Sequence, residues 1–207
     1  MSEHREGHGD LLVGAVLAGG LGRRLGGEKA TARLRGRSLI EYPLDALRAV
    51  VADVAVVAKP DTTLPALPGI TVWSEPGVPR HPLVGLIHAL RRADGRPVLV
   101  CAADLPLVTP ALIACLAASP PSEALARLAA YSGQVQPLLG RYEPAAVEPL
   151  EAALAQDPRA PLREAVARLG PELVAVKDPA VLFNVNTPAD LRRAGTLLEE
   201  LSRRSPT

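Results

Sequence analysis

Aromatic residues are scarce in this sequence, and long hydrophobic runs are absent from it. Aromatic residues make up 2% of the 207 residues, so Ala, Val and Leu must supply the bulk of any core. No apolar run reaches the roughly 18 residues that a transmembrane helix requires, and residues 1–10 lack the apolar segment of a signal peptide. We therefore expect a globular cytoplasmic protein without a membrane-spanning helix.

Cysteine is also rare, and neither sign of charge is in excess. Cys101 and Cys115 do not have the close spacing of metal ligands, and a reducing compartment suits them. The sequence contains 23 Lys and Arg residues against 22 Asp and Glu residues. Proteins that bind nucleic acid usually carry a clear excess or cluster of positive charge. We therefore predict that neither nucleic acid nor a membrane is a partner of this protein.

Hydrophobic residues make up 48% of the sequence, and their segments alternate between strand and helix patterns. Apolar runs predict strands at 12–17, 53–58, 70–73, 97–102 and 173–176, and periodic segments predict helices at 38–50, 83–93, 110–118, 144–155, 162–169 and 188–202. This alternation predicts an α/β fold with a doubly wound, mostly parallel sheet and helices on both faces. We expect one domain over 11–203, preceded by a disordered tail at 1–10.

Three helix starts carry their own signals. Ser38 and Glu41 have the spacing of a capping box, which predicts that a helix begins there. Thr109 and Thr187 each precede a proline, as N-cap residues often do. Segment 123–131 is ambiguous, because its period fits a helix while its position before a Ser-Gly turn fits a β-hairpin.

The segment 12–29 passes from a predicted buried strand into glycines and cations, a pattern that suits phosphate binding. The segment departs by one residue from each of two common nucleotide-binding motifs. Gly20, Gly22 and Gly26 miss the dinucleotide-binding spacing because Leu25 stands where the third glycine belongs. A P-loop would need lysine where Glu28 stands.

The remaining pattern is Leu17–Gly20 followed by Arg24 and Lys29. Glycines let backbone N–H groups approach phosphate oxygens, an arginine can grip phosphate as a planar fork, and a lysine can act as a point charge. Residues 20–40 hold six Lys and Arg residues against one Glu. The alternative is a glycine-rich surface turn with solvated charges, and the position after a buried strand favours phosphate binding over it.

These residues resemble the start of the MobA-like molybdenum cofactor guanylyltransferases, a family of the nucleotidyltransferase superfamily. The double glycine of Leu17–Gly20, the Arg24-Leu25-Gly26 segment and Lys29 carry the resemblance, with Glu28 in place of a common Asp. Segments 101–106 and 184–188 resemble two further motifs of the family, in the family's order. The resemblance extends over residues 11–200 and implies a nucleotidyltransferase fold.

Asp104 follows the predicted strand 97–102 directly. On the residues alone, a Mg²⁺ ligand and a turn-forming aspartate are equally good interpretations. The resemblance implies that Asp104 binds the metal, because the family's metal-binding aspartate lies in a similar segment.

Three further segments have counterparts in the family. Glu75 stands where these proteins usually carry an Asp that contacts the guanine nucleotide, although an exposed loop carboxylate is the alternative interpretation. His81 replaces a family glycine beside the base, and we assign it no catalytic role. Pro137 lies in a segment near the family's acceptor site. Asn184 and Asn186 match a family Asn-x-Asn-Thr-Pro motif, and a helix cap by Thr187 does not account for both asparagines.

The resemblance implies Mg²⁺-dependent transfer of GMP from GTP to the terminal phosphate of molybdopterin cofactor, with release of pyrophosphate. Transient contacts with cofactor-insertion proteins or molybdoenzymes are also expected. The implied catalytic residues are Arg24, Lys29 and Asp104, the nucleotide-binding residues are Leu17, Ala18, Gly19, Gly20, Lys29, Glu75 and Asp104, and the acceptor-binding residues are Pro137, Asn184 and Asn186. The alternatives are a cytidylyltransferase, another nucleotidyltransferase with a different phosphorylated acceptor, and a non-catalytic nucleotide-binding module.

Overall fold

A computed structural model describes residues 12–20, 29–121 and 123–204, so the predicted tail at 1–10 lies outside the described residues. The strands are β1 (Val13–Leu17), β2 (Arg33–Leu34), β3 (Arg37–Ser38), β4 (Asp53–Ala58), β5 (Thr71–Ser74), β6 (Val98–Ala102), β7 (Ala126–Tyr131), β8 (Gln134–Tyr142) and β9 (Glu172–Ala175). The helices are α1 (Glu41–Arg48), α2 (Pro82–Arg92), α3 (Pro110–Ala117), α4 (Val147–Gln156), α5 (Leu162–Ala167) and α6 (Pro188–Arg204). Short 3₁₀ turns are η2 (Pro144–Ala146) and η3 (Pro179–Leu182).

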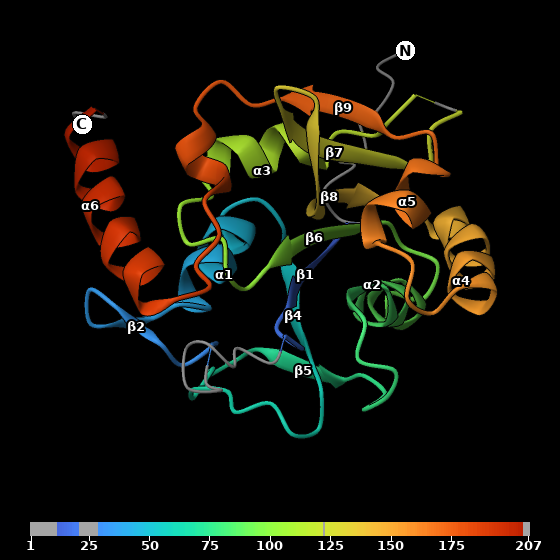
Figure 1. Ribbon diagram of the computed structural model, residues 1–207, viewed down its shortest axis with the longest axis horizontal. Coiled ribbons are helices and arrows are strands. Elements are labelled where there is room, and N and C mark those ends of the chain that lie inside the picture. The colour runs from blue at the N-terminus through green and yellow to red at the C-terminus, as the bar shows by residue number, and fades with distance from the viewer. Residues whose placement is uncertain (1–11, 21–28, 122, 205–207) are drawn as a thin grey trace, which may run out of the picture.

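One seven-stranded sheet runs through the molecule in the order β5-β4-β1-β6-β8-β7-β9 (Figure 1). The pairs β4–β5, β1–β4, β1–β6 and β7–β9 are parallel, and β8 is antiparallel to both of its neighbours. The carboxyl ends of β1, β4, β5 and β6 therefore lie along one edge of the sheet, and the beginning of β8 reaches the same edge.

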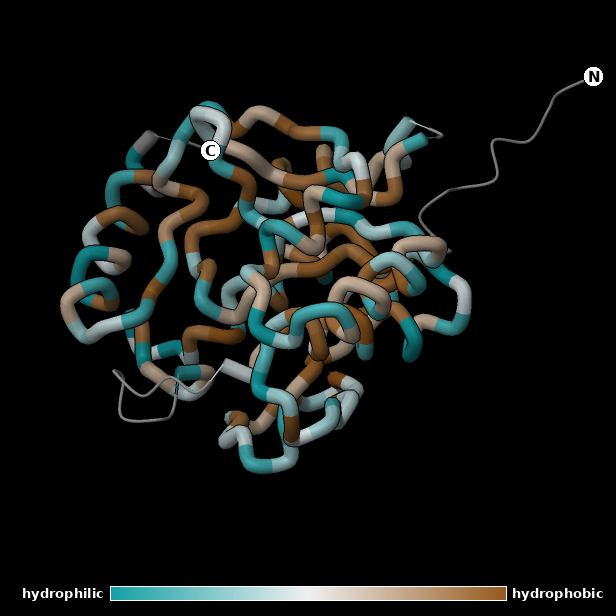
Figure 2. Tube along the Cα trace, turned by 45° about the vertical axis from the view of Figure 1, so that its right-hand side comes forward, coloured by the Kyte–Doolittle hydropathy of each residue, from teal (hydrophilic) through white to brown (hydrophobic). Residues whose placement is uncertain are grey.

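Helices cover both faces of the sheet, so the predicted doubly wound α/β class is confirmed. Helices α1 and α3 pack on one face, and α2, α4 and α5 pack on the other (Figure 1). Strand β6 shows why both faces are covered: Leu99 and Cys101 belong to the first core, whereas Val98 and Val100 belong to the second. Alternating side chains of a strand point to opposite faces, and a run that is apolar throughout must be buried on both. Figure 2 shows hydrophobic residues concentrated in these central strands.

The ambiguous segment 123–131 is part of a β-hairpin. Strand β7 pairs antiparallel with β8, and the turn between them contains Ser132 and Gly133, both with positive φ. A glycine adopts this left-handed backbone at little cost. The hairpin interpretation is therefore confirmed, because pairing with β8 outweighs the local helical period.

The predicted capping box at Ser38 is only half formed. Ser38 belongs to β3, which pairs with β2 in a small separate ribbon, so the helix begins at Glu41 and has Ile40 as its N-cap residue. The Glu41 carboxylate still accepts a hydrogen bond from the Ser38 N–H, with Oε2 and N 2.5 Å apart. Strand pairing displaced the helix start, and the helix ends at Arg48 rather than near residue 50.

The C-terminal helix α6 lies apart from the sheet and packs near the β2–β3 ribbon (Figure 1). Its Ala194 joins a small core with Leu34, Leu39 and Val185. The predicted caps hold here and at α3: Thr187 Oγ1 accepts from the Asp190 N–H at 3.1 Å, and Thr109 Oγ1 accepts from the Leu112 N–H at 3.3 Å. Every helix in the described part of the chain is too short or too polar to span a bilayer.

Candidate active site

A cavity of about 290 Å³ opens at the carboxyl edge of the sheet. Its lining comes from the ends of β1, β4, β5 and β6, the start of α2, the start of β8 and the segment before α6. The lining residues are Leu17, Ala18, Gly19, Gly20, Lys29, Ala30, Lys59, Glu75, Arg80, His81, Pro82, Gly85, Ala102, Ala103, Asp104, Gln136, Leu138 and Asn184. Open α/β sheets place their ligands in this crevice, so its position alone marks it as the candidate site.

Parallel pairing aligns the strand ends that supply the lining. The Ala18 N–H donates to the Val57 carbonyl at 2.8 Å, and the Ala103 N–H donates to the Leu17 carbonyl at 3.1 Å. These bonds extend the ladder one residue beyond β1 and β6. The first glycines and Asp104 therefore leave the sheet side by side, although they are far apart in the sequence.

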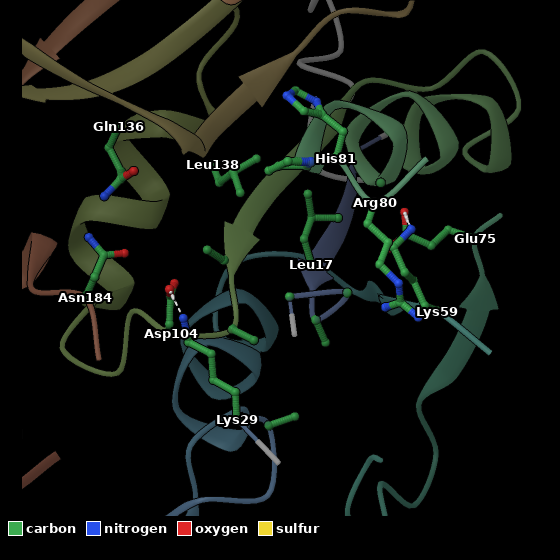
Figure 3. Close-up of a pocket in the computed structure, with 18 residues that line it drawn as sticks. Leu17, Lys29, Lys59, Glu75, Arg80, His81, Asp104, Gln136, Leu138 and Asn184 are labelled. Carbon is green, nitrogen blue, oxygen red and sulfur yellow. Dashed lines mark hydrogen bonds and ion pairs between the residues drawn. The ribbon is translucent and has the colours of Figure 1, made fainter. Parts of the chain in front are cut away.

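Lys29 and Asp104 form the central contact of the site. Lys29 Nζ lies 2.5 Å from Asp104 Oδ2 and 2.7 Å from Asn186 Oδ1 (Figure 3 shows the Lys29–Asp104 contact). The Lys29 and Asp104 side chains are each 17% exposed, so water screens this ion pair only partly. The Lys29 ammonium, which is predicted to bind phosphate, therefore contacts both the predicted metal ligand Asp104 and the predicted acceptor-binding residue Asn186.

The segment before α6 reaches the site through its backbone. The Val185 N–H donates to the Asp104 carbonyl at 2.9 Å, which fixes the neighbouring asparagines beside Asp104. Asp190 Oδ2 accepts from the Asn186 and Thr187 N–H groups at 3.0 and 2.9 Å. The Asp190 pKa is held below its ordinary value, chiefly by the hydrogen bond from the Asn186 backbone. The helix cap therefore also fixes the backbone that carries Asn186.

Glu75 is buried rather than exposed, so the exposed-loop interpretation is wrong. Its side chain is 4% exposed, and Oε2 lies 3.4 Å from Nζ of the equally buried Lys59. Lys59 Nζ also donates to the Pro76 carbonyl at 2.8 Å. Burial raises the Glu75 pKa above its ordinary value, and the charge of Lys59 opposes this shift only in part.

Two glycines make room for the Glu75 carboxylate. A Cβ added at Gly19 would lie 2.0 Å from Glu75 Oε1, and one added at Gly85 would lie 3.1 Å from Oε2. The first distance is far inside van der Waals contact, so an alanine at 19 would have to push the carboxylate aside. Gly19 is thus needed for close approach of a side chain, in addition to any role of its N–H.

The lining divides into two sides. Figure 3 shows Asp104, Gln136 and Asn184 on one side of the cavity and Lys59, Glu75 and Arg80 on the other, with Leu17 between them. The first side presents amide and carboxylate groups, and the second presents a buried ion pair and a guanidinium. A cavity built in this way can hold two polar ligands next to each other.

Asp104 retains the capacity to bind a divalent cation. Its Oδ1 atom is buried and accepts no hydrogen bond from the described residues. Mg²⁺ commonly binds through one or two carboxylates together with substrate phosphates, so a cluster of several acidic residues is not required. The residues present therefore fit a magnesium ion that is shared with a bound phosphate.

The structure brings most of the predicted site residues together. Leu17, Ala18, Gly19, Gly20, Lys29, Glu75, Asp104 and Asn184 line the cavity, and Asn186 reaches Lys29 from outside the lining. Arg24 lies outside the described residues. Pro137 does not line the cavity, whereas its neighbours Gln136 and Leu138 do, because alternate residues of a strand point to opposite faces.

Lys59 and Arg80 are lining residues that the sequence interpretation missed. Lys59 is the first residue after β4 and Asp104 is the second residue after β6, and this position just past a buried strand was a usable signal for Lys59 as well. Arg80 lies in the proline-rich loop between β5 and α2, where no local pattern distinguishes it from a solvated arginine. Only the folding of that loop over the strand ends reveals it.

The fold is that of a nucleotidyltransferase. The chain is similar to the solved structure of 2-C-methyl-D-erythritol 4-phosphate cytidylyltransferase from Thermus thermophilus, with a TM-score of 0.64 and 24% sequence identity. The match covers 89% of this chain and 98% of the cytidylyltransferase chain. A solved structure from Archaeoglobus fulgidus, molybdopterin-guanine dinucleotide biosynthesis protein A, gives a TM-score of 0.75 at 26% identity over 91% of this chain and 99% of its own.

The chain belongs to the family described as the MobA-like NTP transferase domain, which matches residues 14–173. A relative from Chloroflexus aggregans, named probable molybdenum cofactor guanylyltransferase, is 37% identical over 88% of this chain and 92% of its own length. A molybdenum cofactor guanylyltransferase from Rhizobium meliloti is 31% identical over 96% of this chain and 97% of its own length. The family that the sequence motifs predict is therefore confirmed.

Proposed function

We propose that this protein transfers GMP from GTP to the terminal phosphate of molybdopterin cofactor and releases pyrophosphate. The observation that carries the proposal is the cavity at the carboxyl edge, where the glycines after β1, Lys29 and Asp104 meet the Asn184 side of the lining. The names of the two relatives above supply the identity of the nucleotide and the acceptor. The reaction is expected in the cytoplasm, with transient contacts to cofactor-insertion proteins or molybdoenzymes.

The reaction is a displacement at phosphorus. An oxygen of the acceptor's terminal phosphate forms a bond to the α-phosphorus of GTP. The bond from that phosphorus to the oxygen that bridges the α- and β-phosphates breaks. The bonding electron pair leaves with pyrophosphate. Such chemistry depends mainly on positioning and charge stabilisation, so no nucleophilic side chain is needed.

This chain's own residues would hold the phosphates and the acceptor. The N–H groups of Ala18–Gly20 and the Lys29 ammonium would bind the triphosphate, with Arg24 as a further predicted ligand. Asn184 and Gln136 would bind the acceptor, since side-chain amides both donate and accept hydrogen bonds. Asp104 lies on the side of Asn184 and Gln136 and contacts Lys29 (Figure 3). It would hold Mg²⁺, which supplies charge neutralisation to the phosphate oxygens when bound.

The Glu75 side of the cavity suits a guanine. Guanine presents N–H donors beside a carbonyl acceptor, and a carboxylate next to a cation is complementary to that edge. Glu75 Oε2 is buried and accepts no well-formed hydrogen bond from the described residues, and Lys59 lies beside it. A buried acceptor without a donor is costly, and a bound base could supply the donor.

A panel of nucleotides and acceptors tests the proposal. Purified protein would be incubated with Mg²⁺, molybdopterin and GTP, CTP, ATP or ITP, and pyrophosphate release would be measured. We expect release with GTP and molybdopterin together, less with ITP because it lacks the 2-amino donor, and none when molybdopterin is omitted. Release with CTP in preference to GTP would replace the proposal by a cytidylyltransferase, and no release with any pair would refute the enzyme.

A further inference from the structure

Arg80 occupies a position that neither the sequence motifs nor the fold explains. It lies in the loop between β5 and α2 and lines the cavity, and Figure 3 shows its side chain on the side of Lys59 and Glu75. It also lines a second, smaller hollow of about 40 Å³. That hollow is formed by Ala18, Gly19, Gly20, Lys29, Ala30, Asp61, Thr62, Thr63 and Arg80. Arg80 therefore borders both the main cavity and the space over the glycines.

The ion pair of Arg80 with Asp61 does not account for this position. The two groups are hydrogen-bonded, and the Arg80 guanidinium holds the Asp61 pKa below its ordinary value. Their side chains are 37% and 58% exposed, however, and ion pairs in water contribute little to stability. What the pair does is orient the guanidinium across the edge of the cavity, between the loop after β4 and the loop after β5.

Arg80 also has more unused donors than the other described cations of the lining. Lys29 has three N–H donors and already serves Asp104 and Asn186. Lys59 is buried beside Glu75 and donates to the Pro76 carbonyl. Arg80 has five N–H donors in a planar fork, and its hydrogen bond to Asp61 uses the Nη2 group. One edge of the guanidinium can remain on Asp61 while another binds an oxyanion.

The other residues of the smaller hollow indicate which ligand the free edge of the Arg80 guanidinium binds. Gly19 and Gly20 present backbone at one wall, and Lys29 presents a second cation there. Thr62 and Thr63 add groups that can donate hydrogen bonds. Asp61 is the acidic member of the lining, and its charge is compensated by Arg80. Glycine backbone, two cations and hydroxyl groups form a site for phosphate rather than for a base.

We propose that Arg80 binds the phosphate chain of the nucleotide opposite Lys29, and that Asp61 is a positioning residue that orients Arg80 for this contact. The inference rests on the proposed function in taking GTP as the nucleotide. It adds a cation from the β5–α2 loop to the phosphate site that the glycine loop and Lys29 define.

Binding of GTP, GMP and guanosine to Arg80→Ala, measured by titration calorimetry with Mg²⁺ and without acceptor, tests the inference. We expect the affinity for GTP to fall at least about tenfold, as for loss of a charged hydrogen bond. The loss should be smaller for GMP and less than about twofold for guanosine, because a phosphate contact cannot affect a nucleoside. Arg80→Lys should recover part of the loss, since it keeps the charge but not the fork.

Asp61→Ala is the matched control, because it breaks the same ion pair from the other side while leaving the guanidinium. We expect it to lose about two- to threefold in GTP affinity, because the guanidinium remains but is no longer oriented by a carboxylate. Unchanged GTP affinity in Asp61→Ala would show that Asp61 does not position Arg80. Equal losses in Asp61→Ala and Arg80→Ala would show that the pair only ties two loops together, and would overturn the inference. Unchanged GTP affinity in Arg80→Ala, or an equal loss for guanosine, would overturn it as well.

These outcomes are separate from failure of the proposed function. If the wild-type protein binds GTP but releases no pyrophosphate with molybdopterin, the proposed acceptor or the proposed activity is wrong. The titrations of the variants still test the contact between Arg80 and the phosphates in that case. If the wild-type protein prefers another nucleoside triphosphate, the same three variants are titrated with that nucleotide and its monophosphate and nucleoside. A wild type that binds no nucleoside triphosphate would refute both.

Discussion

Lys29 Nζ lies 2.5 Å from Asp104 Oδ2, so an ammonium group stands against the carboxylate that is proposed to bind Mg²⁺. Asn186 Oδ1 holds the same ammonium at 2.7 Å. Two cations beside one carboxylate repel each other. We therefore expect the protein to bind a divalent cation weakly until a nucleotide phosphate draws Lys29 away from Asp104.

The variant Lys29→Met tests this competition directly. It keeps the length of the side chain and removes the charge, so the affinity for Mn²⁺ without nucleotide should rise about tenfold, as read by Mn²⁺ electron paramagnetic resonance. In the wild type, GTP should raise the Mn²⁺ affinity. Equal Mn²⁺ affinities for the variant and the wild type would show that Oδ1 binds the metal independently of Lys29.

Removing the proposed metal ligand should abolish turnover without unfolding the protein. For Asp104→Asn we expect pyrophosphate release to fall at least about a hundredfold, because the amide cannot neutralise a metal or hold Lys29 as an anion does. Glu164→Gln removes an exposed carboxylate on α5 and serves as the control. A variant at Asp104 with wild-type turnover would remove this residue from the mechanism.

The two asparagines should separate kinetically, because the structure gives them different neighbours. Asn184 lines the cavity beside Gln136, whereas Asn186 is bonded to Lys29. Asn184→Ala is expected to raise KM for molybdopterin and to leave KM for GTP nearly unchanged. Asn186→Ala is expected to raise KM for GTP, because Asn186 holds Lys29 in place. Steady-state kinetics with each substrate varied in turn would measure both. Identical patterns for the two variants would contradict this division.

Gly19 should tolerate alanine less well than Gly20. A Cβ at Gly19 would lie 2.0 Å from Glu75 Oε1, whereas one at Gly20 would have no other atom within 4 Å. We expect Gly19→Ala to lower the free energy of unfolding by about 1–3 kcal/mol, as overpacking does, and Gly20→Ala to change it by less than about 1 kcal/mol. Urea denaturation measures both, and equal values would contradict the contact with Glu75.

The raised pKa of Glu75 predicts a particular dependence of stability on pH. Between the unfolded and the higher native pKa, the folded chain binds more protons at this carboxyl than the unfolded chain does. The free energy of unfolding contributed by this group therefore decreases as pH rises through that window, and the penalty stays at its full value above the native pKa. Glu75→Gln has no titrating group at this position and should show a flatter profile at pH values above the ordinary pKa of a glutamate, about 4.3. Parallel profiles would contradict the shift.

Local pattern was sufficient where a segment's own chemistry decides its structure. The apolar runs fixed most strands, and Thr109 and Thr187 marked two helix starts. Local pattern predicted the wrong helix start at Ser38, because pairing of β3 with β2 moved the start to Glu41. It could not choose between a helix and a hairpin for segment 123–131, because pairing with another strand decides the structure of that segment. Phosphate binding by the glycine loop was predicted from its glycines, its cations and its position after a buried strand, whereas the metal role of Asp104 was predicted from the family resemblance.

Tertiary structure decided which of these residues act together and which others join them. The burial of Glu75 between Gly19 and Gly85, the ion pair of Lys59, and the position of Arg80 depend on loops folding over the strand ends. The sequence by itself determined the α/β class and the family, because strand periodicity and short motifs are local. It did not determine that one ammonium group joins Asp104 to Asn186, since contacts between distant residues exist only when the sheet aligns the ends of its strands.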